Sequence, residues 1–286
     1  MKKTHLILLA IPALMLSGCT KEISKEEAKD VATKIAAKQK EEAAKNDVIR
    51  AQMTSSQTSE VVGEGSDEAK SQYNKTSSGE VMLEYQTSKL VAHASSQSSK
   101  EGESGDMWAL AKDDKVYLLM DGGDAKVGRV VTPEEGQTIN MDYLLTFLDE
   151  VGFGYILFSL DTVLSSIQEG KDVDADATEE YGDNVTTSLK YLTAGEGNLT
   201  VEDAVTVKDA TYEIGALKGT ANGSITTKYA WDKYLPLEAS YEGSIDIEAQ
   251  LLGGKLNLKQ TMKNSLKYSY SGDVEVPNVE DFKIVG

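Results

Sequence analysis

The sequence predicts an α+β protein built on one large, twisted antiparallel sheet. The main reason is the stretch from about Asn184 to Tyr270, where apolar and polar residues alternate as in half-buried strands. Two-residue hairpin signals, Asn222-Gly223 and Gly253-Gly254, interrupt this stretch. Helical spacing of apolar residues appears instead after Ser24 and again between Met141 and Gln168. We therefore expect an N-terminal helix and a central helix pair packed on the sheet.

The first nineteen residues have the pattern of a secretory signal. Lys2 and Lys3 provide a positive start, an apolar run extends from Leu6 to Leu16, and small residues precede Cys19. The run of about eleven residues is too short for the roughly twenty that span a bilayer. Residues 1–18 are therefore predicted to be a signal peptide.

The tetrad Leu16-Ser17-Gly18-Cys19 resembles the lipobox of bacterial lipoproteins, and Cys19 is the single cysteine of the chain. The resemblance implies a diacylglycerol on the Cys19 thiol, cleavage before Cys19 and a fatty acid such as palmitate on the new amino group. Such a protein is anchored by lipid to the cell membrane on its extracytoplasmic side, since two or three acyl chains anchor stably. The alternative is an ordinary signal peptide that contains a cysteine by chance. We expect residues 19–24 to be a lipidated tether and residues 25–286 to be a single domain.

Composition excludes several classes of protein. The chain has 29 Lys and Arg against 47 Asp and Glu, and loss of the signal removes two of the lysines. An acidic surface repels nucleic acid, so we expect no nucleic-acid partner. No cysteine remains for a disulfide once Cys19 is acylated. His93 is the one histidine after the signal, which argues against histidine catalysis and multi-histidine metal sites.

The first predicted helix begins with a capping box, because Ser24 is followed three residues later by Glu27. Good helix formers continue to about Lys45, and Val31 and Ile35 lie on one face. Two interpretations are open: a helix packed on the domain, or a solvated stalk that lifts the domain off the bilayer. The shared apolar face favours packing.

The first half of the sheet has weaker signals. The polar stretch from Ser55 to Ser78 is compatible with disorder, or with a solvent-facing strand at Glu60 to Val62. Alternation is clear after Gly79. The range from Met107 to Met120 predicts a hairpin that turns at Asp113-Asp114.

The central apolar region predicts helices at Met141 to Glu150 and at Tyr155 to Gln168, with a stop at Gly170. Two helices buried on a sheet explain this region. A lid over an apolar cavity, with Phe153 at its hinge, is the other interpretation. The acidic stretch from Lys171 to Asp183 begins like a calcium loop but lacks the glycine and glutamate that an EF-hand needs, so we expect a solvated loop and no metal.

The order of elements resembles that of the LolA-like and LppX/LprG-like carriers. The local features of this resemblance are Val116-Tyr117-Leu118, Tyr234-Leu235-Pro236-Leu237 and Val274-Glu275-Val276-Pro277. The resemblance implies an open half-barrel with helices on its concave face. It also implies that lipids or acylated proteins bind in the apolar concavity.

We found no nucleophile elbow, zinc-protease motif, phosphate-binding loop or dinucleotide fingerprint, so we expect no enzymatic activity and no cofactor. The main hypothesis is a surface lipoprotein that binds a lipid or acylated ligand between sheet and helices, as a carrier or sensor. The alternative is a structural or interaction lipoprotein with a filled core and no ligand. The candidate ligand-binding residues are Leu148, Phe153, Ile156, Leu160, Leu164, Tyr229, Trp231, Ile245 and Ile247.

Overall fold

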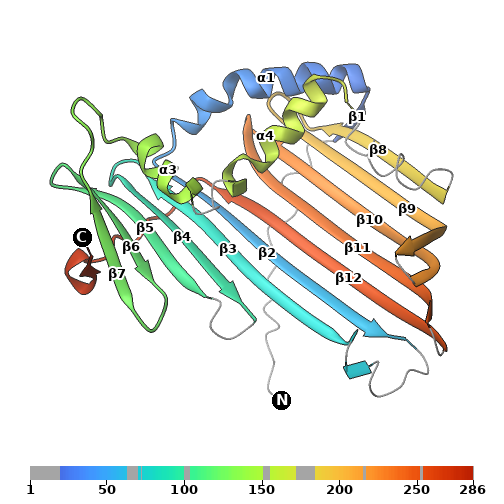
Figure 1. Cartoon of the computed structure of the whole chain (residues 1–286). Helices are drawn as coiled ribbons and strands as arrows, with labels where there is room; N and C mark the ends of the chain where they lie inside the picture. The colour runs from blue at the N-terminus through green and yellow to red at the C-terminus, as the bar shows by residue number, and fades with distance from the viewer. Residues whose placement is uncertain are drawn as a thin grey trace, which may run out of the picture.

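The computed structural model describes residues 20–62, 70–71, 73–99, 104–150, 155–171, 184–214, 217–251 and 254–285. Within them the chain forms one 13-stranded sheet with helices at one end (Figure 1). The strands are β1 (Lys21–Ile23), β2 (Val48–Val61), β3 (Lys75–Gln86), β4 (Val91–Ser98), β5 (Gly105–Lys112), β6 (Lys115–Asp121), β7 (Lys126–Val131), β8 (Val185–Thr193), β9 (Leu199–Ile214), β10 (Leu217–Asp232), β11 (Leu235–Leu251), β12 (Gly254–Ser269) and β13 (Lys283–Ile284). The helices are α1 (Lys25–Ala43), α3 (Met141–Glu150), α4 (Tyr155–Gln168) and the short 3₁₀ helix η2 (Val279–Asp281).

Two antiparallel meanders make up the sheet. Strands β2 to β7 form one and β8 to β12 the other, and they join because β12 pairs with β2. β1 pairs with β8 at one edge, while β13 pairs with β7 at the other, in the only parallel pairing of the sheet. The predicted α+β class with a large antiparallel sheet is confirmed.

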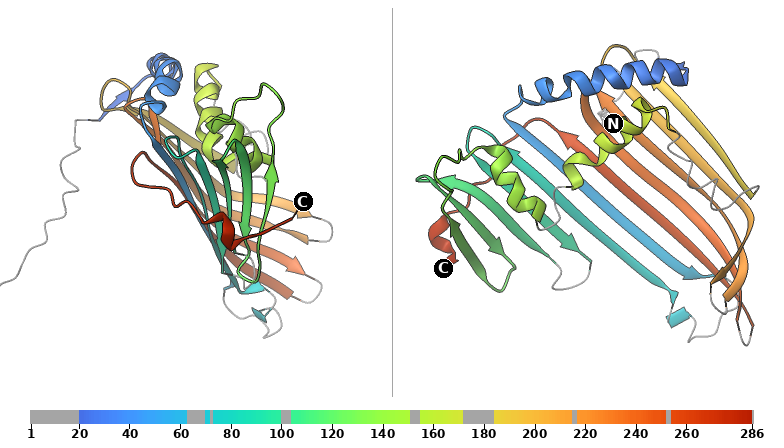
Figure 2. Two further views of the ribbon diagram at one scale, coloured as in Figure 1. Left: turned by 90° about the vertical axis from the view of Figure 1, so that its left-hand side faces the viewer. Right: turned by 45° about the horizontal axis from the view of Figure 1, so that its top comes forward.

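The sheet is an open half-barrel. Figure 2 shows it bent along its length, with α3 and α4 on the concave side and α1 along the upper edge. The lower halves of β9 to β12 and of β2 extend well beyond these helices (Figure 1). The predicted placement of the helices on the concave face is confirmed.

Helix α1 packs on the domain and is not a stalk. The Ser24 hydroxyl accepts a hydrogen bond from the Glu27 amide, and the Glu27 carboxylate accepts one from the Ser24 amide, so the predicted capping box is formed. Ala28, Ala32 and Ile35 are completely buried along one stripe of the helix. They share a hydrophobic cluster with α4 and the upper end of the sheet.

Helices α3 and α4 have the predicted bounds but belong to different hydrophobic clusters. Leu144 and Leu148 of α3 pack with side chains of β3 to β6, including Leu83. Leu160 and Leu164 of α4 pack with α1 and with the ends of β8 to β12 and β2. The predicted hinge residue Phe153 lies outside the described residues.

The polar stretch from Ser55 to Ser78 contributes to two long strands, so disorder is the wrong interpretation for its described part. β2 continues to Val61, and β3 begins at Lys75. Ser55 is paired with Gly79 of β3 and with Asn264 of β12. Backbone pairing on both sides therefore holds this segment extended despite its polar side chains.

The expected hairpin at Asn222-Gly223 is wrong, because both residues lie inside β10. The pairing of β9 with β10 shifts register between Ala221 and Gly223, which marks a β-bulge. The Asn222 side-chain oxygen accepts a hydrogen bond of 2.9 Å from the amide of Asp209, a residue with positive φ. The Asn-Gly pair thus marks a bulge instead of a turn.

The predicted turn at Asp113-Asp114 is confirmed. Asp113 and Asp114 have φ of 52° and 58°, as a tight hairpin between β5 and β6 requires. At the Gly253-Gly254 signal, Gly254 is already paired with Leu251 at the start of β12, and Gly253 lies outside the described residues. The acidic stretch from Lys171 to Asp183, expected to be a solvated loop, lies outside the described residues after Lys171.

Candidate functional site: the concave face

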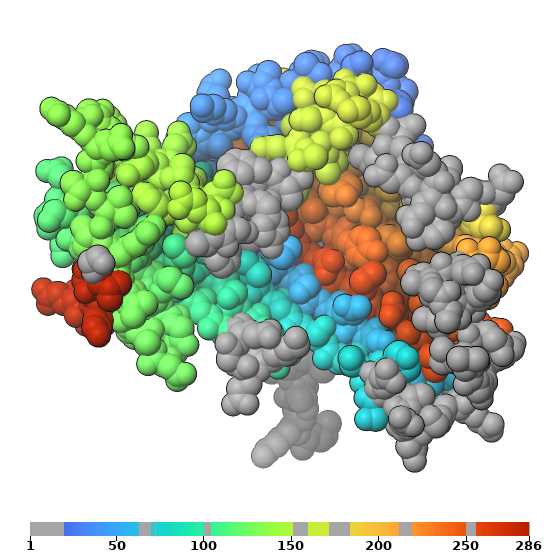
Figure 3. All heavy atoms as spheres, in the orientation of Figure 1, coloured from blue at the N-terminus to red at the C-terminus, as the bar shows by residue number. Residues whose placement is uncertain are grey.

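The concave faces of β9 to β12 carry apolar side chains beyond the reach of the described helices. Strand alternation directs every second residue to this face, and the residues between them are mainly polar. The apolar strip, as we call this set, consists of Val205, Ile225, Ile245, Ile247, Leu256, Leu258 and Met262. Figure 3 shows this part of the sheet hollowed below α4.

Sheet register makes the strip continuous across four strands. Val205 is opposite Ile225, Ile225 is opposite Gly243, and Gly243 is opposite Met262. A Cβ at Gly243 would lie 3.0 Å from the Ile225 Cγ1 atom, so the missing side chain leaves room for Ile225 to cover β11. Further along, Ile247 is opposite Leu258. These residues are half-buried or buried, which places apolar surface in a concave setting.

Next to the apolar strip, the concave face becomes polar on β2 and β3. Ser55, Gln57 and Ser59 follow Ala51 and Met53 on this face of β2. Their neighbours on β3 are Gly79, Ser77 and Lys75. The concave face therefore has an apolar half and a polar half, with Lys75 at the end of the polar half.

At the upper end, under α4, the concave face is already filled. Trp231 is completely buried and packs with Leu160, Leu164 and Ile35, with Tyr229 partly buried beside it. Burial raises the pKa of the Tyr229 hydroxyl, and the nearby Asp203 carboxylate adds to the effect. The Tyr229 hydroxyl is therefore neutral at physiological pH.

The predicted ligand-binding residues fall into three groups. Leu160, Leu164, Tyr229 and Trp231 lie together in the filled cluster. Leu148 belongs to the separate cluster of α3.

The third group is formed by Ile245 and Ile247, which lie on the apolar strip below the helices. Ile156 is part of α4, but its side chain is outside the described part of the structure, as are Cys19 and Phe153. Neither the helix pair nor the sheet thus forms a single site from all the predicted residues.

Of the strip, the candidate ligand-binding residues included Ile245 and Ile247 but not Val205, Ile225, Leu256, Leu258 or Met262. Sequence reasoning also missed the part that α1 takes in closing the upper end. The alternation of Leu199, Val201 and Val205 was a usable signal, although the buried Asp203 interrupts it. Met262 stands alone among polar neighbours in β12. Only its register against Gly243 reveals its place.

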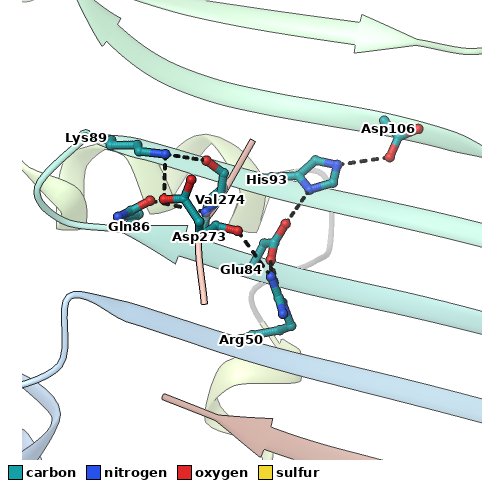
Figure 4. Close-up of polar contacts among 8 residues, drawn as sticks. All are labelled: Arg50, Glu84, Gln86, Lys89, His93, Asp106, Asp273 and Val274. Carbon is teal, nitrogen blue, oxygen red and sulfur yellow. Dashed lines mark hydrogen bonds and ion pairs between the residues drawn. The ribbon is translucent and has the colours of Figure 1, made fainter. Parts of the chain in front are cut away.

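A second polar feature lies on the convex face, where four neighbouring strands supply a row of charged side chains (Figure 4). His93 Nδ1 lies 3.0 Å from a Glu84 carboxylate oxygen, and His93 Nε2 lies 2.9 Å from Asp106 Oδ1. The guanidinium of Arg50 pairs with the other Glu84 oxygen. Sheet register explains the row, because Arg50 is opposite Glu84 and Glu84 is opposite His93.

Contacts within the charged row favour the charged forms of His93 and Glu84. Burial opposes the charge on His93, but hydrogen bonds to Glu84 and Asp106 outweigh burial and raise the pKa of the imidazole. Burial likewise opposes the charge on Glu84, but hydrogen bonds from His93 and Arg50 hold its pKa below the usual range. Among the described residues, no group of three or more histidine, cysteine, aspartate or glutamate side chains could hold a metal ion.

One hollow of about 380 Å³ is lined mostly by polar residues of β10 to β12, including Asn222, Asp246, Glu248 and Asn257. These residues alternate with the strip residues Ile247 and Leu258, so this hollow lies on the convex face and is not part of the apolar strip. Another hollow, of about 570 Å³, adjoins the β5–β6 turn at Asp113 and is lined mainly by loop residues.

The fold and this face define an α+β protein with an open half-barrel whose concave side is apolar on one half. No family model matches the sequence, and no curated protein matches it. Among solved structures, the chain is similar to lipovitellin, in a structure of lipid–protein interactions, with 9% identity over 80% of this chain and a TM-score of 0.29. It spans 26% of that lipovitellin chain.

Two further similar structures are those of OpdQ and of the outer membrane protein AlkL. OpdQ of Pseudomonas aeruginosa matches 79% of this chain and 98% of its own, with 8% identity and a TM-score of 0.16. The outer membrane protein AlkL matches 81% of this chain with a TM-score of 0.11. TM-scores this low carry no argument about what the chain binds. None of the helices in the described residues is long and apolar enough to cross a membrane.

Proposed function

We propose that this protein is a membrane-anchored surface lipoprotein whose concave face binds an acyl chain of a lipid or of an acylated protein. The observation that carries the proposal is the apolar strip below α4, which the described helices leave uncovered (Figures 1 and 3). Val205, Ile225, Ile245 and Met262 form its centre. Half-buried apolar surface in a concavity is typical of ligand sites.

An acyl chain fits this surface chemically. Each methylene transferred from water to an apolar surface contributes about 0.8 kcal/mol. Affinity should therefore rise about fourfold for each added methylene until the strip is filled. The polar half on β2 and β3, with Ser55 and Gln57, offers hydrogen bonds to the polar end of such a ligand.

The membrane anchor remains a proposal from the sequence. β1 begins at Lys21, so only Thr20 separates it from Cys19. Two residues span at most about 7 Å, so an acylated Cys19 would hold the β1–β8 edge at the membrane surface. The expected tether of residues 19–24 is shorter than foreseen, because Lys21 to Ile23 belong to the sheet.

Cys19→Ser tests the anchor. The variant should lose labelling by a palmitate analogue and should leave the membrane fraction. Normal acyl labelling of the variant would show that the anchor is elsewhere.

The ligand is tested by purifying the Cys19→Ser chain from whole cells and identifying co-purifying lipids by mass spectrometry. Ile225→Asp places a charge in the middle of the strip and should abolish lipid capture, since an unpaired charge against an acyl chain is unfavourable. Thr226→Asp is the matched control, because Thr226 is the next residue on β10 and is exposed on the convex face. Leu160 is unsuited to the test, since it is 1% exposed within the core and its loss would destabilise the fold.

A second function is favoured by the filled upper end of the sheet, where Trp231 and Leu160 belong to the same buried hydrophobic cluster. The chain would then be a structural or interaction lipoprotein without a ligand. The same experiment separates the two. A chain that carries no lipid, and takes up none from phosphatidylglycerol vesicles at any acyl length, supports the structural role.

A further inference from the structure

The C-terminal strap, residues 272–285, crosses the convex face of the sheet. Two of its side chains are buried there: Val274 is 0% exposed and Phe282 is 6% exposed. They complete a hydrophobic cluster with Val48, Trp108 and residues of β4 to β6. Between these two anchors the strap is mostly exposed, for example at Val276. The strap is therefore held at two points and not along its length.

Polar contacts fix the first of these points (Figure 4). The amide of Val274 donates a hydrogen bond of 3.1 Å to the Gln86 side chain, and Lys89 Nζ donates one of 3.0 Å to the Val274 carbonyl. Lys89 also forms an ion pair of 2.6 Å with Asp273. The Arg50 guanidinium approaches the Asp273 carbonyl at 3.5 Å. Each of these partners comes from β2, β3 or the turn after β3.

His93 lies beneath both points. Its ring stacks on Trp108, with centroids 4.7 Å apart and planes 10° apart, and Trp108 in turn meets Phe282 edge-on at 6.0 Å. On its other side, His93 binds Glu84, and Glu84 holds the Arg50 guanidinium that reaches the strap. A change at the imidazole therefore reaches the strap along two routes.

Other charged groups surround this centre. Lys126 of β7 lies 5.6 Å from the centre of the Phe282 ring and forms an ion pair of 2.9 Å with Asp121 of β6. Asp106 and Asp281 also act on Lys126 electrostatically. On the strap side, Lys89 pairs with Asp273, and Asp47 is the carboxylate nearest to Asp273. Around His93 itself, the contacting groups are the two carboxylates, which favour the charged imidazolium.

We propose that the strap is a latch that seats on the convex face when His93 carries a proton and releases when His93 loses it. The imidazolium donates from both nitrogens, to Glu84 and to Asp106, whereas a neutral ring donates from one nitrogen only. Loss of one donor leaves a carboxylate of the row without its hydrogen bond, so the ring that stacks on Trp108 loses one of its two anchors, and Trp108 loses support where it contacts Phe282. The latch is therefore closed in acidic to neutral solution and opens as the solution becomes alkaline.

The two ends of the strap suit this motion. Gly272 has φ of +114°, a conformation that favours glycine, and it stands beside the Arg50 guanidinium as a hinge. At the far end, the attachment to β7 is short: Lys283 and Ile284 of β13 pair with it, and the Val285 amide donates a hydrogen bond of 2.8 Å to the Gly128 carbonyl. Release exposes the face of Trp108 and the free edge of β7, two surfaces on which a partner could pack.

The test is amide hydrogen exchange of the full chain in detergent, read by mass spectrometry as protection factors. Protection of the strap peptide, residues 273–285, should fall as the pH rises from about 6.5 through the raised pKa of His93, about tenfold for each unit by which seating raises that pKa. A peptide from β11 should keep its protection over the same range. In His93→Gln, protection of the strap should be low and independent of pH.

Two variants of β3 make the test specific. Glu84→Gln should also lower protection of the strap, because it removes the charge that holds Arg50 and His93. Glu80→Gln is the matched control: Glu80 faces the same side of the same strand, bonds Gln52 at 2.8 Å and does not touch the strap. The proposal would be overturned by the wild-type chain alone if protection of its strap stayed constant across this pH range. So would a His93→Gln profile identical to that of the wild type.

Discussion

Replacing Ile35 by alanine would test whether α1 is part of the core. Ile35 is completely buried between α1, α4 and the sheet. The change removes three buried carbons, or about 2.4 kcal/mol at 0.8 kcal/mol per carbon. The cavity left behind adds to this, so we expect a loss of about 3–4 kcal/mol in the free energy of unfolding. For a chain of this size the loss corresponds to a fall in Tm of roughly 6–16 °C.

Urea unfolding followed by circular dichroism and by tryptophan fluorescence would measure this loss. Trp231 lies in the same cluster as Ile35, so a Trp108→Phe background makes the fluorescence report on that cluster alone. Lys34→Ala is the matched control, since Lys34 precedes Ile35 on α1 and is exposed. The control should change stability by less than about 0.5 kcal/mol. Equal losses for Ile35→Ala and Lys34→Ala would refute the packing of α1 on the core.

Three further predictions concern single residues. Ser24→Ala removes the helix cap and should reduce the free energy of unfolding by about 1 kcal/mol in urea titrations; no loss would mean that the cap does not matter. Gly223→Ala places a Cβ 2.4 Å from the Ser244 carbonyl oxygen, so thermal unfolding should show a loss of about 1–3 kcal/mol, and an unchanged Tm would contradict the close strand approach. The charged row should stabilise the fold most between pH 4.5 and 6.5, the ordinary pKa values of Glu84 and His93. The pKa of His93 is raised in the folded chain, so its contribution to the free energy of unfolding is lost as pH rises through that raised pKa. The pKa of Glu84 is lowered, so its contribution is lost as pH falls through that lowered pKa. Glu84→Gln should flatten this profile in urea titrations at each pH, and a profile as curved as that of the wild type would contradict the reasoning.

The candidate site was foreseen only in part. The alternation in β11 identified Ile245 and Ile247 as one face of a strand, and both lie on the apolar strip. The helical spacing identified Leu160 and Leu164 as buried, but the pattern gave no means to decide what they pack against. They close the upper end of the sheet together with α1. The spacing of apolar residues shows which side of a helix or strand is apolar, but it does not show which element covers that side.

The sequence by itself determined the local elements: the capping box at Ser24, the bounds of α3 and α4, and the turn at Asp113-Asp114. These features depend on contacts within a few residues, so the local residue pattern is sufficient to specify them. Tertiary structure alone decided that β12 pairs with β2, which joins the two meanders into one half-barrel. It also made the Asn222-Gly223 signal a bulge.

The charged row and the strap that covers it are also features that only the tertiary structure reveals. Arg50, Glu84, His93 and Asp106 come from four strands, and no spacing in the sequence relates them. They meet because each strand's register fixes which residues stand opposite one another, and a slip of one residue would turn each side chain to the other face. Register between strands is set by the packing of the whole sheet. The buried imidazole of His93 could therefore be found only in the folded chain.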